Sequence, residues 1–219
     1  MTPQTTFDAG AEFDRQVHTL VECEYPAMAG MTPEQFHALV TPLRPVAVSA
    51  GNPACEPAAG RLPFLLVVQR QVVPIEQMMP RTTLHGTAKP GFVDHSFEPG
   101  SLERFLAIKE TDLPDQPVYL LFDIERGEEF CGAIPNAAMD TIRDRGRTPL
   151  TIEEGIAMTT QFPEVLVKNK CYSLGGSRCG DRRVPAIWIS KNAPKLGWCW
   201  EGNPHTWLGM ASAAHRDSV

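Results

Sequence analysis

Residues 184–200, VPAIWISKNAPKLGWCW, carry the clearest fold signal of the chain. The stretches 184–189 and 196–200 are rich in apolar, β-branched and aromatic residues, which favour strands, and the residues between them are typical of a connection. Two further runs, FLLVVQRQVV (64–73) and VYLLFDI (118–124), have the same character. The sequence therefore predicts a sheet that contains these strands.

Helical patterns surround the strands. Apolar residues at helical spacing predict a helix over 10–24, and TPEQ (32–35) has the capping-box pattern that starts a second helix, which ends near 44–45. Prolines spaced from 53 to 117 leave no room for a long helix between 49 and 118. Two more helices are predicted, over 135–145 and from the capping box TIEE (151–154) to Pro163. The fold class is α+β, with an N-terminal helical hairpin and a mostly antiparallel sheet with two inserted helices.

The length of 219 residues is enough for one domain with a stable core. Apolar residues make up 42% of the chain and charged residues 21%, values near those of globular proteins, so disorder is expected only at the ends. We predict a single domain over 1–219. The helical hairpin of residues 1–48 packs on the rest, and residues 210–219 form a disordered tail.

The sequence also indicates where the protein works. No run approaches the roughly 20 consecutive apolar residues of a membrane helix, and residues 1–11 lack the basic and apolar parts of a secretory signal. In the cytosol the six cysteines should be reduced, and no CxxC pair occurs among them. We expect a cytoplasmic protein without membrane contact.

Charge is unevenly distributed along the chain. The formal net charge of −6 argues against nucleic acid as a partner. Residues 1–60 carry seven acidic and two basic residues, whereas residues 168–195 carry seven basic residues and one acidic residue, Asp181. The basic segment predicts a surface that attracts anions, unless it is a solvated face balanced by the acidic N-terminal helices.

Aromatic and reactive side chains are concentrated near the C-terminus. All four tryptophans lie within 188–207, and the alternation of a strand places Trp198 and Trp200 on one face and Cys199 on the other. An Asn-Pro turn follows and is itself followed by His205. Aromatic walls with a few convergent polar groups are typical of small-molecule sites.

We therefore interpret the C-terminal third as the site of a small anionic or aromatic ligand. Arginine binds acidic groups through two parallel N–H donors, and glycines at 175–176 and 180 would leave backbone N–H groups open to an anion. The competing interpretation is structural, since tryptophan also fills the core and rim of sheets. The predicted ligand-binding residues are Arg178, Arg182, Arg183, Trp198, Trp200, His205 and Trp207.

An interaction module is the alternative function for the same segment. Tryptophan and arginine also dominate protein interfaces, so a basic face that bears tryptophans would dock an acidic partner protein. A concave site with converging side chains would favour the ligand, and a flat exposed patch would favour the partner.

The cysteines support a second alternative, a zinc site or a thiol enzyme. Cys171, Cys179, Cys199 and His205 have the side-chain chemistry of zinc ligands, but they lack the close pair that structural zinc sites use, and buried reduced thiols explain them as well. A thiol enzyme would use Cys179, which lies among arginines, or Cys199 as its nucleophile, with His205 as the acid–base group. The sequence contains no HExxH, GxSxG or phosphate-loop motif. Whether the protein is an enzyme therefore stays open, and no cofactor is assigned.

Several segments have an unusual composition that matches a known family. They are PLTIEEGIA (149–157), GSRCGDRRVPAIWIS (176–190) and KLGWCWEGNPHTWLG (195–209), supported by 7–36 and 90–102. Through them nearly the whole chain resembles an actinobacterial family, domain of unknown function 5701. The resemblance implies a bacterial protein of one domain, and it assigns no activity and no site residues.

Overall fold

The segment 184–200 forms the strand pair that the sequence predicts. In the computed structural model, which describes residues 7–50 and 55–219, it makes up β8 (Arg183–Ser190) and β9 (Ala193–Trp200). The strands are antiparallel, and Lys191 and Asn192 join them with φ of 52° and 58°. Two residues with positive φ form the hairpin turn whose twist matches that of the flanking strands.

The other strands lie on both sides of this pair in the chain. They are β1 (Arg61–Val68), β2 (Phe92–Val93), β3 (Leu106–Ala107), β4 (Val118–Glu125), β5 (Thr148–Pro149), β6 (Cys171–Ser173), β7 (Ser177–Arg178), β10 (Leu208–Met210) and β11 (Ser212–Asp217). One sheet has the order β1-β4-β11-β5 and is antiparallel throughout. A second has the order β10-β6-β8-β9-β2, in which the β10–β6 and β2–β9 pairs are parallel. β3 and β7 form a separate antiparallel ribbon.

Helices precede and interrupt the strands. They are α1 (Ala9–Glu22), α2 (Tyr25–Met28), α3 (Pro33–Val40), α4 (Arg44–Ser49), α5 (Ile75–Met78), α6 (Pro135–Asp144) and α7 (Ile152–Gln161). The predicted α+β class is confirmed, with N-terminal helices, mostly antiparallel strand pairing and two inserted helices, α6 and α7. As expected from the prolines, α5 with four residues is the longest α-helix in the described part of 49–118.

The N-terminal helices form the expected hairpin and extend it. α3 begins at the predicted capping box, in which Thr32 and Gln35 each bond the other's backbone N–H. α4 then folds back onto α1, where Arg44 donates to the Asp14 carboxylate at 2.8 and 2.9 Å.

The edge strand β1 is covered by α1. Gln16 of α1 is fully buried, and its side-chain amide donates to the carbonyl of Phe64 (3.0 Å) and accepts from the N–H of Leu66 (2.7 Å). β1 pairs with β4 on its other side, so Gln16 binds backbone groups that would otherwise form an open edge.

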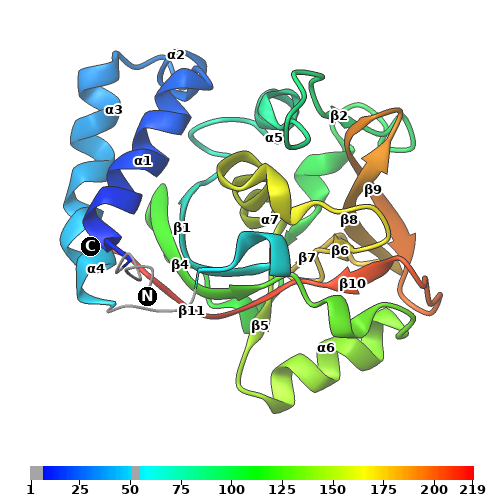
Figure 1. Ribbon diagram of the computed structural model, residues 1–219. Coiled ribbons are helices and arrows are strands. Elements are labelled where there is room, and N and C mark those ends of the chain that lie inside the picture. Colours follow the sequence, from blue (N-terminus) through cyan, green and yellow to red (C-terminus); the bar gives the residue numbers. More distant parts are fainter. Residues whose placement is uncertain (1–6, 51–54) are drawn as a thin grey trace.

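α7 lies between the two main sheets (Figure 1), and all of its residues are buried. It starts at the second predicted capping box, where Thr151 and Glu154 exchange hydrogen bonds of 2.8 and 3.3 Å. Gly155 allows a close approach to the second sheet, because a Cβ there would lie 2.4 Å from a methyl group of Leu174. One continuous apolar core extends from Ala9 through this helix to Ala213.

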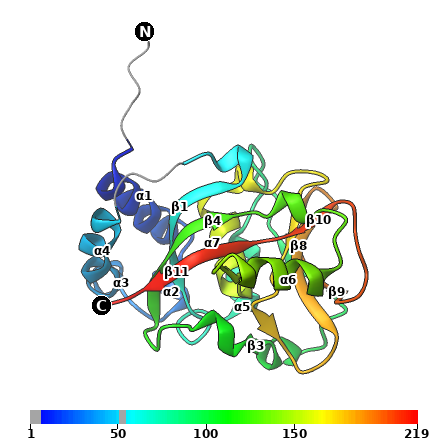
Figure 2. The ribbon, with the colours of Figure 1, turned by 90° about the horizontal axis from the view of Figure 1, so that it is seen from below.

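The prediction of a disordered tail over 210–219 is wrong. Met210 ends β10, and after Ala211 the chain enters β11, which pairs with both β4 and β5. Figure 2 shows β11 crossing the molecule toward the N-terminal helices. The sequence of β11, SAAHRD, lacks the β-branched and aromatic residues of a typical strand, and its pairing on both sides compensates for this weak propensity.

Candidate functional site

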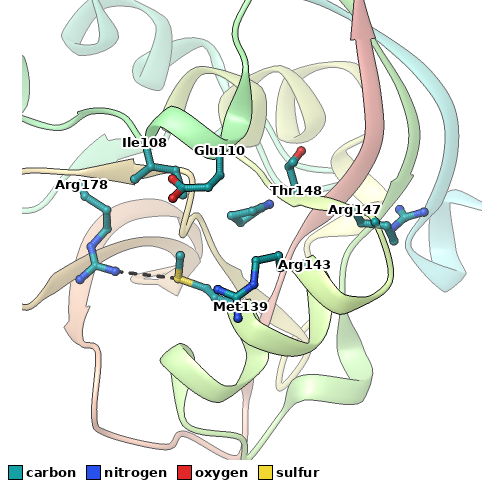
Figure 3. Close-up of a pocket in the computed structure, with 9 residues that line it drawn as sticks. Ile108, Glu110, Met139, Arg143, Arg147, Thr148 and Arg178 are labelled. Atoms are coloured by element: carbon teal, nitrogen blue, oxygen red, sulfur yellow. Dashed lines mark hydrogen bonds between the residues drawn. The ribbon is translucent and has the colours of Figure 1, made fainter.

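A cavity of about 460 Å³ opens between α6, β5, β7 and the short 3₁₀ turn η5 (Lys109–Thr111). Its volume lies in the range of small-molecule sites, roughly 300–1,000 Å³. Figure 3 shows the side chains around it. The lining residues are Ile108, Glu110, Met139, Arg143, Gly146, Arg147, Thr148, Pro149 and Arg178.

The end of α6 and a glycine just before β7 bring the walls together. Gly146 follows α6 in the left-handed conformation that commonly ends a helix, with φ of 68°, and directs the chain into β5. At Gly176, just before β7, a Cβ would lie 2.5 Å from the carbonyl oxygen of Pro149, so only glycine permits this approach to β5.

Backbone hydrogen bonds lock η5 and β7 to the rest. The N–H of Ile108 donates to the carbonyl of Gly176 at 2.9 Å. The N–H of Gly176 donates to the carbonyl of Leu150, also at 2.9 Å. The expectation that Gly176 offers its N–H to an anion is therefore wrong, and the glycine serves close packing instead.

Arg178 is the predicted ligand residue that lines this cavity. Its Nη2 donates to the Glu201 carboxylate and, at 3.3 Å, to the carbonyl of Asp181. Its Nη1 has the sulfur of Met139 as acceptor, at 3.8 Å, and its Nε has no partner. Because a thioether is a weak acceptor, Nη1 retains the capacity to donate to a ligand oxygen.

The two arginines near the end of α6 that belong to the cavity lining have different roles. Arg143 is 65% exposed and has one ion pair, with Asp140 at 2.7 Å. Arg147 is 12% exposed, and it donates to the carboxylate and the carbonyl of Asp123 (both 2.6 Å) and to Ser212 Oγ (3.0 Å). Its side chain is directed away from the cavity in Figure 3. Arg147 therefore holds β5 to the sheet. Arg143 keeps N–H donors that have no acceptor among the described residues.

Glu110 and three apolar residues complete the lining. The Glu110 carboxylate is directed into the cavity in Figure 3, and within residues 7–50 and 55–219 it has no ion pair. Ile108, Met139 and Pro149 supply apolar surface. The cavity can therefore hold a small molecule that has both charged and apolar parts.

A buried ion pair supports the β5 wall. Arg216 of β11 donates to both Glu154 oxygens (2.6 and 2.8 Å) and to Thr148 Oγ1 (2.6 Å), and the Tyr119 hydroxyl donates to Glu154 at 2.8 Å. Burial and the nearby Glu154 charge raise the pKa of Tyr119. Burial alone would lower the pKa of Arg216, but the Glu154 carboxylate outweighs it and raises this pKa.

The tryptophans divide between the two faces of the β8–β9 pair. Trp198 and Trp200 have ring centroids 4.9 Å apart. The Trp188 ring covers Gly197, where a Cβ would lie 2.1 Å from that ring. Trp207 packs against Trp188, with ring centroids 6.0 Å apart. Side chains alternate along β9, so Trp198 and Trp200 face away from the other two. The predicted ligand residues Trp198, Trp200 and Trp207 therefore do not form one wall, and none of them lines the cavity.

His205 packs within its own turn. Its ring lies 5.3 Å from that of Trp207, and its carbonyl accepts from the N–H groups of Gly132 (2.8 Å) and Leu208 (3.2 Å). The crevice beside it measures about 10 Å³, about the space of one water molecule. The structure does not bring His205 to the cavity that Arg178 lines.

Carboxylates pair with most of the basic segment 168–195. The pairs are Arg178–Glu201, Arg182–Glu201, Arg183–Asp181, Lys170–Glu128 and Lys195–Asp94. Apart from Asp181, these acids lie outside the segment in the sequence and reach it only in the fold. The expected anion-attracting surface is therefore largely neutralised.

The cysteines show no activated thiol. Burial raises the pKa of Cys199 to about 11. Burial and a hydrogen bond to Asp181 raise the pKa of Cys179, although arginines flank it. Burial also raises the pKa of Cys171. In the part of the chain that the structure describes, no three His, Cys, Asp or Glu side chains are placed to hold a metal ion, so the zinc set with His205 is not assembled.

Fold and cavity together define an α+β protein with an arginine-lined cavity of small-molecule size. No helix in the described residues is long and apolar enough to cross a membrane. The chain belongs to the family of unknown function DUF5701, which matches residues 19–219, and this confirms the family resemblance. No curated protein matches the chain, and no solved structure does.

Sequence reasoning missed most of the cavity lining, including Arg143 and Glu110. One signal was present, because RDRGR (143–147) places three arginines around a predicted helix end. Glu110 had no such signal, since it comes from an irregular segment whose neighbours in space are distant in sequence.

Proposed function

We propose that this protein binds a small ligand with an acidic group and an apolar body in the cavity between α6, β5, β7 and η5. One observation carries the proposal. Arg143 and Arg178 lie on either side of Met139 in Figure 3, and both retain N–H donors that have no oxygen acceptor among the described residues. Charge-assisted hydrogen bonds from arginine are the usual means of holding a carboxylate or phosphate.

The contacts around Arg178 support the proposal. Glu201 and the Asp181 carbonyl hold its Nη2, so the guanidinium is oriented before a ligand arrives. Less side-chain freedom is then lost on binding, which favours affinity. Ile108 and Pro149 would contact the apolar body.

Matched acids and amides test the proposal. Ligand-observed NMR with the purified chain would compare hydrocinnamate and isocaproate with hydrocinnamamide and isocaproamide. We expect at least one acid to bind about tenfold more tightly than its amide, a difference of about 1.4 kcal/mol, because the amide lacks the charge that the arginines recognise.

Arg143→Gln should weaken acid binding by a similar factor. Arg145→Gln is the control, since it removes the same charge from the same helix end at a residue that pairs with Glu129 and does not line the cavity. The proposal would be contradicted if the amides bind as well as the acids. It would also be contradicted if Arg143→Gln and Arg145→Gln weaken acid binding equally.

The two alternatives from the sequence have less support. Trp200 and Arg182 remain exposed, at 45% and 70%, but the tryptophans are divided between the two faces of the β8–β9 pair, so they form no single docking face for an acidic partner protein. A thiol enzyme would need a lowered pKa at Cys179, and its pKa is raised.

The proposed compartment is the cytoplasm. All six cysteines are free thiols, as a reducing compartment would keep them. An actinobacterial source is proposed on the family resemblance of the sequence alone.

A further inference from the structure

The charges that line the cavity do not balance within the protein. Each arginine of the lining has a carboxylate partner outside the cavity. These pairs are Arg143–Asp140, Arg147–Asp123 and Arg178–Glu201. Among the described residues no basic side chain is paired with Glu110. The charge that lacks a partner in the cavity is therefore negative, although arginines outnumber acids in the lining.

The backbone holds Glu110 in place. It lies in η5, where the next residue, Thr111, is buried and its hydroxyl donates to the carbonyl of Ile108 at 2.6 Å. The N–H of Ile108 in turn is fixed to Gly176. The carboxylate enters from the η5 side of the cavity in Figure 3, whereas Arg143 enters from α6.

These positions favour ligands that carry both kinds of charge. A simple anion would still bind the arginines, but less tightly than a zwitterion, because it gains no contact with the Glu110 carboxylate in the same cavity. A simple cation would leave the donors of Arg143 and Arg178 unused. A molecule with an ammonium group toward Glu110 and an acidic group toward the arginines would satisfy both.

We propose that the ligand is a small zwitterion, in which one apolar body carries a protonated amine and an acidic group, as in an apolar amino acid. This inference rests on the proposed function and adds the second charge. Glu110 binds the ammonium group, Arg143 and Arg178 bind the acidic group, and Ile108, Met139 and Pro149 contact the apolar body.

Pairs of probes that differ by one group test the inference. Phenylalanine and leucine would be compared by NMR titration with hydrocinnamate and isocaproate, which lack the amine, and with phenethylamine, which lacks the acid. We expect at least one amino acid to bind about tenfold more tightly than its deaminated acid, and phenethylamine to bind more weakly than phenylalanine.

The variant Glu110→Gln should distinguish the contribution of the ligand's ammonium group from that of its acidic group. It should weaken amino-acid binding about tenfold and leave binding of the deaminated acid unchanged or stronger, because it removes an attraction for one and a repulsion for the other. Glu98→Gln is the control, since Glu98 is also exposed and does not line the cavity. Glu110 has no side-chain partner to lose, so the variant should keep the unfolding temperature of the wild type.

The outcomes distinguish the inference from the proposed function. The zwitterion inference is wrong if the deaminated acids bind as well as the amino acids and Glu110→Gln does not weaken amino-acid binding. If Arg143→Gln still weakens binding of the acids in that case, the proposed anion site stands. If neither amino acids nor acids bind, both proposals are overturned.

Discussion

At the scale of single residues, the buried pair of Glu154 and Arg216 is the most demanding feature of the fold. Glu154 has no exposed side-chain surface and Arg216 has 2%. The N–H of Thr151, the Tyr119 hydroxyl and the Arg216 guanidinium all donate to the Glu154 carboxylate. A charge buried in this way is tolerated only because each of its oxygens has donors.

Removing one partner of this pair should be costly. We expect Arg216→Met to lower the free energy of unfolding by about 3–5 kcal/mol, because it leaves the Glu154 carboxylate buried and uncompensated. Urea denaturation followed by circular dichroism measures the effect. Tyr119→Phe, which removes one hydrogen bond to the carboxylate, should cost less, about 2 kcal/mol. The double variant Arg216→Met, Glu154→Gln should recover part of the loss, and no recovery would argue against a strongly coupled pair.

Asp94 gives the protein a defined sensitivity to acid. Its carboxylate accepts from Lys195 of β9 and from the N–H of Ser96 (2.9 Å). Burial alone would raise the pKa of Asp94, but these bonds outweigh burial and lower it from 3.8 to about 2. A lowered pKa stabilises the fold above the pKa of the unfolded chain, and this contribution is lost as the pH falls through the folded value.

We therefore expect Asp94 to contribute about 2 kcal/mol at neutral pH that disappears between about pH 4 and pH 2. Asp94→Asn should be less stable than the wild type at pH 7, and the difference should shrink in acid. Unfolding curves at a series of pH values measure this difference. A constant difference at every pH would show that Asp94 does not titrate as described.

At the scale of elements, β11 joins the two main sheets. It follows β10 of the second sheet after one residue and lies between β4 and β5 of the first. Its neighbour β10 is also closely packed, because a Cβ at Gly209 would lie 2.2 Å from the carbonyl oxygen of Gly127. Although β11 lies near the end of the chain, it is an internal strand.

Truncation distinguishes an internal strand from a dispensable tail. A chain that ends at Ala211 should fail to fold, because it loses the pairing of β4 with β11 and the partner of Glu154. A chain that ends at Asp217 should keep most of its unfolding temperature, since β11 is then complete. Circular dichroism and thermal unfolding would compare the two. A folded, soluble chain ending at Ala211 would refute the role of β11.

Elements with local signals were predictable from the sequence, and those without them were not. The β8–β9 pair and the capping boxes at Thr32 and Thr151 depend on residues close in sequence. β11 depends on its neighbours in the sheet, so local propensity could not reveal it. For the same reason Arg178 was found as a candidate but its partner Glu201 was not, since an ion pair between segments distant in sequence leaves no local pattern.

At the scale of the whole molecule, the cavity exists only because distant segments meet. Its walls come from 108–110, 139–149 and 178. The β5–β11 pairs, the contact of Gly176 with Pro149 and the hydrogen bond from Ile108 to Gly176 hold these segments together. A ligand in the cavity would contact all of them at once and should stabilise them as a unit.

Hydrogen–deuterium exchange can test this coupling. With phenylalanine or hydrocinnamate, whichever binds, at about a hundred times its dissociation constant, the folded state should gain about 2.7 kcal/mol. We expect slower exchange in three segments together, around Ile108, across the end of α6 and in β7, because the ligand bridges them. β8 and β9, which do not line the cavity, serve as the internal reference. Protection confined to β8 and β9 would instead place the ligand against the tryptophans and favour the site first inferred from the sequence.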